Sequence, residues 1–114
     1  MKIDRQKLYE KYDKHCAYCG VELISIGEMQ ADHIVPKVDG GTDDFSNLNP
    51  SCSDCNNYKC HSSLEDFRYY MKQFLNDKPE YLFKSKTKMR IAIKLGVVTL
   101  NKWDGKFYFE RSKK

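Results

Sequence analysis

The sequence lacks long apolar runs, internal repeats and low-complexity linkers. No stretch approaches the ~20 apolar residues that a transmembrane helix needs, so we expect no membrane-spanning segment. The first residues, Met1 to Arg5, have no apolar core of the kind found in a secretory signal peptide, which favours an intracellular protein. Hydrophobic residues nevertheless make up 40% of the chain and aromatic residues 13%, which is enough to form a core.

The length of 114 residues suits one small domain and hardly two, so we predict a single domain over residues 1–114. Such a domain buries only a modest core, and a bound metal ion would stabilise its fold. The net charge of +4 is uneven: residues 1–61 hold seven Lys/Arg and ten Asp/Glu, whereas residues 62–114 hold thirteen and six. A basic half beside an acidic half suits a polyanion held against a cation site. The alternative is a solvated lysine-rich surface.

Four of the five cysteines form two CxxC pairs with 32 residues between them. These residues are Cys16, Cys19, Cys52 and Cys55. Inside a cell thiols stay reduced, and two such pairs can close a tetrahedron around a structural Zn²⁺ with no position left for a catalytic water. The alternatives are buried thiols without a metal, or a redox pair. Cys60 is interpreted as a half-buried helix residue, and His15 or His61 could replace one cysteine ligand.

The N-terminal half predicts short elements around these cysteines. A capped helix is expected over residues 5–14, and residues 21–26 and 29–35 are β-prone and could pair as strands. Residues 48–51 form a short extended piece. Ser53 or Asp54 could then cap a helix that carries Asn56 and Lys59.

The C-terminal half predicts further helices and a hairpin. The segment from Ser62 to Glu65 has the form of a capping box, so a second helix with one apolar face, or a kink in the preceding helix, is expected to begin there. A further helix is expected over residues 80–95. Residues 97–103 and 106–110 would form a hairpin around an Asp104-Gly105 turn. The expected fold class is therefore α+β.

One segment carries a motif. The matching residues are Asp32-His33-Ile34-Val35-Pro36, Gly40-Gly41, Asn47-Leu48, Cys52-x2-Cys55-Asn56 and Lys59. In this pattern the chain resembles the HNH endonuclease family, which has a ββα-metal fold, over about residues 12–61. The intervals of fourteen residues from His33 to Asn47 and nine from Asn47 to Asn56 are similar to those of the nuclease domain in CRISPR effector proteins that cuts the target strand.

The chemistry of phosphodiester hydrolysis asks for the same residues. It needs a water, a base and positive charge on the phosphate and the leaving oxygen. A histidine such as His33 titrates near neutrality and can be the base. On a regular strand Asp32 would point to the opposite face from His33, unless the strand is twisted or a helix reaches around its edge. The resemblance implies that Asp32 reaches the metal and that His33 faces the water.

The remaining site residues follow from the resemblance and from ligand chemistry. Asn56 stands where many relatives have histidine, and its amide oxygen with a carboxylate favours Mg²⁺ or Mn²⁺; Asn57 is the alternative ligand. The resemblance implies that Asn47 hydrogen-bonds across the loop and holds the strand of His33. Lys59, one helical turn after Asn56, could contact the scissile phosphate. The adjacent carboxylates of residues 43–44 are interpreted chiefly as solvated loop groups, with a supporting role as the alternative.

The basic half supplies candidate DNA contacts. These are Lys84, Lys86, Lys88 and Arg90, with the hairpin lysines beside them. Such groups bind phosphates in a salt-dependent manner that is independent of sequence. We expect the helix over residues 80–95 and the hairpin to clamp DNA beside the site. The aromatic side chains of this half are interpreted as core more than as base-stacking groups.

The sequence therefore favours an HNH-type DNA endonuclease that uses one catalytic Mg²⁺ or Mn²⁺ and leaves 3′-hydroxyl and 5′-phosphate ends, as the resemblance implies. Two alternatives stay open: a zinc-knuckle nucleic-acid-binding module without catalysis, and a nuclease that acts on RNA. One centre cuts one strand per encounter, so double-strand breaks would need a dimer or successive nicks. A phage or bacterial origin is favoured by analogy alone.

Overall fold

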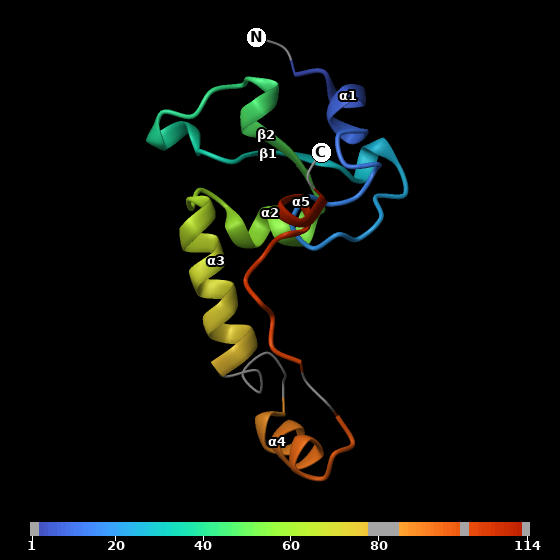
Figure 1. The fold of residues 1–114 in the computed structure, drawn as a ribbon, viewed down its shortest axis with the longest axis vertical. Helices are drawn as coiled ribbons and strands as arrows, with labels where there is room; N and C mark the ends of the chain where they lie inside the picture. Colours follow the sequence, from blue (N-terminus) through green and yellow to red (C-terminus); the bar gives the residue numbers. More distant parts are fainter. Residues whose placement is uncertain (1–2, 78–84, 99–100, 113–114) are drawn as a thin grey trace. The chain divides into compact units, whose positions relative to one another are not determined.

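The computed structural model describes residues 3–77, 85–98 and 101–112, which form short helices and one small sheet (Figure 1). The α-helices are α1 (Arg5–Tyr9), α2 (Ser53–Lys59), α3 (Leu64–Lys72), α4 (Lys86–Lys94) and α5 (Tyr108–Ser112). The strands are β1 (Gln30–His33) and β2 (Leu48–Ser51). Three 3₁₀ turns, η1 (Ile26–Glu28), η2 (Lys37–Asp39) and η3 (Phe45–Asn47), and one π-helical turn, η4 (Gln73–Asp77), complete the elements.

The chain divides into two compact units, Met1–Phe67 with Lys106–Lys114, and Arg68–Gly105. The first unit holds the sheet, the cysteines and the motif; the second holds most of α3 and all of α4. No helix among the described residues combines the length and apolar character needed to cross a membrane. The prediction of a single domain over residues 1–114 stays a prediction.

The sheet consists of β1 and β2, paired antiparallel with Asp32 opposite Asn49 and His33 opposite Leu48. The predicted pairing of residues 21–26 with residues 29–35 is wrong. The backbone of residues 21–23 is bound instead to the start of the first CxxC pair, where Cys16 N donates to Val21 O at 2.8 Å and Leu23 N donates to Lys14 O at 2.7 Å. β1 is thereby left to pair with β2, which the sequence shows only as a short extended piece.

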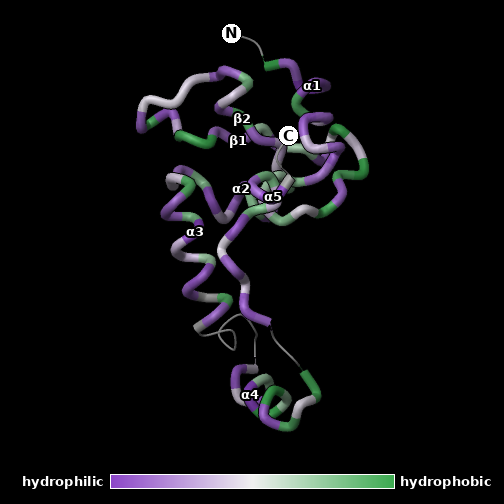
Figure 2. Tube along the Cα trace, viewed as in Figure 1, coloured by the Kyte–Doolittle hydropathy of each residue, from purple (hydrophilic) through white to green (hydrophobic). Residues whose placement is uncertain are grey.

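Aromatic side chains from distant parts of the sequence form the core beside the sheet. The ring of Tyr18 meets Phe67 edge-on at 5.5 Å and Phe107 at 5.3 Å, and Phe67 stacks on Phe107 at 5.0 Å. Figure 2 shows α3 as mainly hydrophilic, and Phe67 is its one buried residue. Edge-to-face and offset rings are the favoured aromatic geometries. This core fixes the loop between Cys16 and Cys19 against α3 and α5.

The cap of α1 is the one that the sequence predicts, whereas two other caps differ by one residue. Cys52 caps α2 in place of Ser53 or Asp54, and Ser63 caps α3 in place of Ser62. Asp4 Oδ1 accepts from Lys7 N at 3.1 Å at the start of α1, and Ser63 Oγ accepts from Asp66 N at 3.1 Å at the start of α3. α1 is shorter than predicted and ends at Tyr9. The predicted helix over residues 80–95 corresponds to α4, and its residues 80–84 lie outside the described part of the chain.

The predicted hairpin is wrong for the residues that the structure describes. Gly105 does take the positive φ of +85° that a turn requires, but the described residues 101–107 contain no strand and α5 is helical. Tyr108 N donates to Tyr18 O at 3.1 Å and Phe109 N donates to Ala17 O at 2.7 Å. These donors are bound by the first CxxC loop, so they are not available to a hairpin partner. The α+β class and the small two-stranded sheet are confirmed.

Candidate functional site

The four paired cysteines lie together in the first unit. Their Sγ atoms all lie within 4.8 Å of one another, and those of Cys19 and Cys52 are 3.8 Å apart. A tetrahedral four-thiolate site with Zn–S bonds of ~2.3 Å has edges of about 3.8 Å between sulfur atoms. Backbone donors point at the sulfurs, with Tyr18 N donating to Cys16 Sγ and Cys55 N to Cys52 Sγ, each at 3.4 Å. The cluster therefore has the donors and dimensions of a structural zinc site.

Hydrogen bonds among the thiols of the cluster shift the pKa values of three of them. A hydrogen bond with Cys19, assisted by one with Cys55, holds the pKa of Cys16 far below its usual value. The hydrogen bond with Cys16 raises the pKa of Cys19 to about 11, and the same neighbour raises the pKa of Cys55 strongly. Ionisation of Cys16 therefore opposes ionisation of Cys19 and Cys55. A dication removes this conflict, and its binding releases the remaining protons.

The motif residues converge on a cleft of about 380 Å³ in the same unit. Asp32 and His33 from β1, together with Asn56 and Asn57 from α2, line this cleft. Asp32 and His33 are neighbours on a strand and would face opposite sides of a flat sheet. Both reach the cleft because α2 packs against β1. The structure thus brings together the carboxylate, the imidazole and the amide that the sequence singled out.

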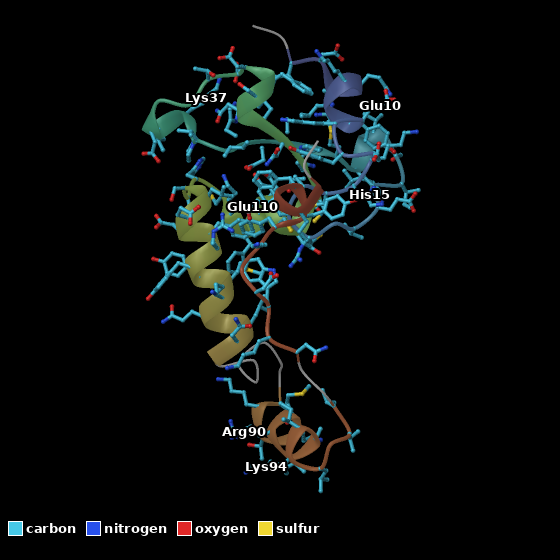
Figure 3. All side chains as sticks on the ribbon, viewed as in Figure 1. Glu10, His15, Lys37, Arg90, Lys94 and Glu110 are labelled. Carbon is cyan, nitrogen blue, oxygen red and sulfur yellow. The ribbon has the colours of Figure 1, made fainter. Side chains whose placement is uncertain are left out.

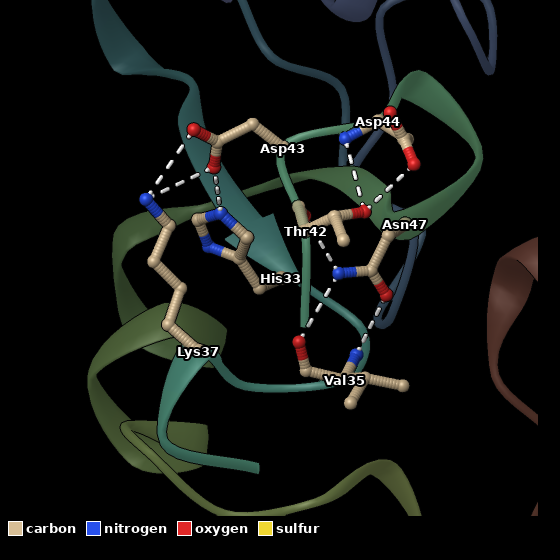
Figure 4. A network of polar contacts seen from close by, with 7 residues as sticks. All are labelled: His33, Val35, Lys37, Thr42, Asp43, Asp44 and Asn47. Carbon is tan, nitrogen blue, oxygen red and sulfur yellow. Dashed lines mark hydrogen bonds and ion pairs between the residues drawn. The ribbon is translucent and has the colours of Figure 1, made fainter. Parts of the chain in front are cut away.

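His33 is held by an acidic partner that the sequence interpretation treated chiefly as a solvated group. Its Nε2 lies 2.7 Å from Asp43 Oδ1, and Lys37 Nζ approaches the same carboxylate at 3.2 Å (Figure 4). The hydrogen bond with His33, followed by that with Lys37, lowers the pKa of Asp43 below its ordinary value. Because an ionised carboxylate can only accept, the Nε2–H of His33 is the donor. The available sequence signal was the Gly40-Gly41 turn, which folds the next residues back toward β1.

The side chain of Asn47 bridges the loop between β1 and β2. Its Oδ1 accepts from Val35 N at 2.9 Å, and its Nδ2 donates to Val35 O at 3.1 Å and to Thr42 O at 2.8 Å (Figure 4). Gly41 lies so close to this network that a Cβ atom there would stand 1.7 Å from Val35 O. Asn47 does not line the cleft, and its side-chain hydrogen bonds within the described residues go to backbone groups of Val35 and Thr42.

Asp32 is 4% exposed and carries two buried donors on one oxygen. Its Oδ2 accepts from the Tyr18 hydroxyl and lies 3.1 Å from Lys59 Nζ. Burial, followed by the charge of Asp32, raises the pKa of Tyr18 well above its ordinary value, so the hydroxyl keeps its proton and donates. Tyr18 was missed as a site residue; its position between Cys16 and Cys19 is the signal that it reaches inward from the cysteine loop.

Lys59 is not at the surface of the cleft. Its side chain is 0% exposed, and Nζ donates to His33 O at 2.8 Å while it pairs with Asp32. The ammonium group therefore bridges the two neighbouring residues of β1 from within the protein. In this position Lys59 holds the strand and neutralises the buried Asp32 carboxylate. Its side chain does not line the cleft.

The candidate DNA contacts lie on α4 of the second unit. Lys86, Lys88 and Arg90 are exposed there, and Figure 3 shows Arg90 and Lys94 extending from this helix. Arg90 Nη2 donates to Thr87 Oγ1 at 3.4 Å. Lys84 lies outside the described residues. α4 therefore presents a positively charged surface. It lies outside the motif, so the motif does not indicate a ligand for it.

Comparison with known proteins agrees with this arrangement. Residues 16–66 match the family described as HNH endonuclease, a segment that starts at Cys16 and includes the four-cysteine cluster, Asp32, His33 and Asn56. No curated protein matches the chain. The matched segment contains β1 and α2, whose residues line the cleft, and β2, which pairs with β1. Residues 16–66 are therefore a domain of the HNH endonuclease family.

Proposed function

We propose that the protein is a DNA endonuclease that hydrolyses phosphodiester bonds with one divalent cation. The observation that carries the proposal is the convergence of Asp32, His33 and Asn56 on one cleft within an HNH domain. The closed four-cysteine cluster leaves no open ligand position, so chemistry is assigned to the cleft and a structural role to the cluster.

The donors in the cleft fit a hard cation. Both contacts of the Asp32 carboxylate go to Oδ2, which leaves Oδ1 as a candidate ligand, and Asn56 adds an amide oxygen. Oxygen donors of this kind suit Mg²⁺ or Mn²⁺. When bound, the cation would supply positive charge for the phosphate and for the leaving oxygen. Asn57 lines the same cleft and stays the alternative ligand.

His33 is assigned the role of general base. Its ring takes a proton from a water molecule, the water oxygen bonds to phosphorus, and the bond from phosphorus to the 3′-oxygen breaks. The products are a 3′-hydroxyl and a 5′-phosphate. Asn47 supports this step by holding the backbone that follows His33. Lys59 is assigned to positioning Asp32 and the His33 carbonyl, in place of a phosphate contact.

The zinc-loaded protein is expected to nick supercoiled plasmid with Mg²⁺ and not with EDTA. Replacing His33 with alanine should lower the rate by about 10²–10⁴-fold, because a positioned base contributes on this scale. His61→Ala is the matched control, since this histidine lines the same cleft outside the motif. Agarose gels of nicked and linear products over time measure both rates.

Three outcomes would contradict the assignment. A wild-type protein that binds plasmid but never cuts it with Mg²⁺ or Mn²⁺ would favour a zinc-knuckle binding module. Cutting that survives His33→Ala but is abolished in His61→Ala would mean that the base was wrongly named. Faster cleavage of RNA than of DNA of the same sequence would replace the proposed substrate. A fourth outcome, linear product that forms without prior nicks, would leave the assignment in place and indicate a dimer.

The basic surface of α4 is proposed to bind DNA phosphates. Reversing Lys86, Lys88 and Arg90 to glutamate should weaken binding to non-specific duplex, and the slope of log K against log salt should fall by about 0.9 for each phosphate that is no longer neutralised. The measurement is fluorescence anisotropy at several salt concentrations. Lys7→Glu, on α1 of the first unit, is compared with Lys88→Glu as a control of equal charge change. An unchanged slope in the triple variant would refute the role of this surface.

A further inference from the structure

We propose that Asp43 is a positioning residue of this reaction, and that its carboxylate fixes the His33 ring so that Nδ1 takes the proton from water. The inference rests on the proposed nuclease function and adds a residue to it. Asp43 lies ten positions after His33 in the sequence, in the loop that joins η2 to η3. The proposal concerns the orientation of the base and not its identity.

The contact geometry supports a fixed pair. Asp43 Oδ1 lies 2.7 Å from His33 Nε2, and both side chains are about four-fifths buried, with 19% and 23% exposed. Lys37 Nζ reaches both carboxylate oxygens, at 3.2 Å and 3.3 Å, and so limits rotation of the group. Asp43 is absent from the lining of the cleft that holds Asp32 and lines a different cavity with Phe45. It therefore supports the ring from outside the cleft.

The backbone delivers Asp43 to this place with little freedom. Gly40 turns the chain at a φ of +90°, and Gly41 passes against Val35 where any side chain would clash. The next residue, Thr42, is held through its carbonyl by Asn47 Nδ2 at 2.8 Å. The residue before Asp43 is thus fastened to the same asparagine that holds the chain after His33. The loop and the motif strand form one hydrogen-bonded unit (Figure 4).

The chemical consequence follows from the two ring nitrogens. A neutral imidazole has one N–H and one lone pair, and an acceptor on one nitrogen decides which tautomer forms. With Asp43 accepting from Nε2–H, the lone pair is on Nδ1. Nδ1 takes one proton from water, the water oxygen bonds to phosphorus, and the released 3′-oxygen gains a proton from solvent. The imidazolium formed in this step is stabilised by the Asp43 carboxylate, as in other histidine–carboxylate pairs.

The kinetic test compares two neighbouring carboxylates. Asp43→Asn, which keeps the shape and removes the charge, is expected to lower kcat for plasmid nicking by about 10–100-fold. Asp43→Leu, which keeps the size but has no acceptor, should lower it further. The KM for DNA and the dependence on Mg²⁺ should stay unchanged. Asp44→Asn is the matched control and should stay near the wild-type rate, because the Asp44 carboxylate accepts from Thr42 Oγ1, whereas the described contacts of His33 and Lys37 go to Asp43.

A second readout does not depend on cleavage. In the zinc-loaded wild type, proton–nitrogen NMR of the His33 ring should show the Nε2–H tautomer with a downfield, slowly exchanging proton. Asp43→Leu should remove that proton signal, while the rings of His15 and His61 serve as internal references.

A fall in kcat with an unchanged His33 tautomer would overturn the proposal, because it would indicate only a distorted loop. Wild-type cutting rates in Asp43→Leu would overturn it as well. If the wild type does not cut at all, the proposed function fails, and the NMR signature still decides whether Asp43 orients the ring.

Discussion

Removal of zinc from the purified protein by a chelator is expected to unfold the first unit, with loss of its near-ultraviolet circular dichroism and its dispersed NMR signals. Structural zinc contributes about 10–16 kcal/mol of apparent binding free energy at neutral pH. A whole small domain has a net stability of only about 5–15 kcal/mol, so the fold without the metal should not persist. Restoring zinc should restore both signals. Trp103 lies in the second unit, so its fluorescence is not a suitable probe.

A comparison of alanine substitutions at two exposed cysteines separates the effect of metal loss from the effect of altered packing. Cys19 belongs to the cluster and Cys60 does not, yet both are exposed, so neither alanine substitution leaves a cavity. Cys19→Ala should bind zinc much more weakly and unfold at lower chelator concentration, whereas Cys60→Ala should match the wild type. Zinc content by mass spectrometry and the chelator midpoint measure the difference. Equal zinc content in the two variants would mean that the cluster is not a metal site.

Replacement of Lys59 by methionine is expected to destabilise the zinc-loaded protein by about 3–5 kcal/mol, because it leaves a buried carboxylate without its cation. The side chains of Lys59 and Asp32 are 0% and 5% exposed, and their charged atoms are 3.1 Å apart. Methionine keeps most of the length and apolar volume of lysine. Urea unfolding without Mg²⁺, so that no added cation neutralises Asp32, gives the free energy.

A double variant tests whether the destabilisation comes from the unpaired charge. Adding Asp32→Asn to Lys59→Met should recover part of the stability, because the amide is neutral and can still accept from the Tyr18 hydroxyl. Lys37→Met is the control at an ion-paired lysine that is 62% exposed, and it should change stability by less than about 1 kcal/mol. A Lys59→Met protein as stable as Lys37→Met would show that the buried pair does not hold β1.

Residue type and spacing were sufficient to predict the cysteine cluster and the motif residues of the site. The two CxxC pairs predicted the cysteine cluster, and the motif singled out Asp32, His33 and Asn56, which line one cleft. Each of these sets combines short-range geometry with a fixed interval along the chain. The helix start at Asp4 was predictable for the same reason, because a cap is decided within four residues, and the caps of α2 and α3 were predicted to within one residue.

Pairing between distant segments was not predictable in the same way. Residues 21–26 and 106–110 are β-prone, yet their backbone groups are bound elsewhere. Val21 and Leu23 bond to residues 14–16, and Tyr108 and Phe109 bond to the loop between Cys16 and Cys19. Propensity describes what a segment favours alone, and a tertiary hydrogen bond of similar strength is enough to redirect it. The hairpin and the first strand pair failed for this common cause.

The sequence by itself determined the α+β class, the metal-binding cysteines and the residues of the HNH motif, because residue type and spacing are local properties. The tertiary structure decided the surroundings of each motif residue. It buried Lys59 against Asp32, aimed the Tyr18 hydroxyl at the same carboxylate, and brought Asp43 onto His33. Burial and partnership set what a charged group can do, and both depend on how the chain packs.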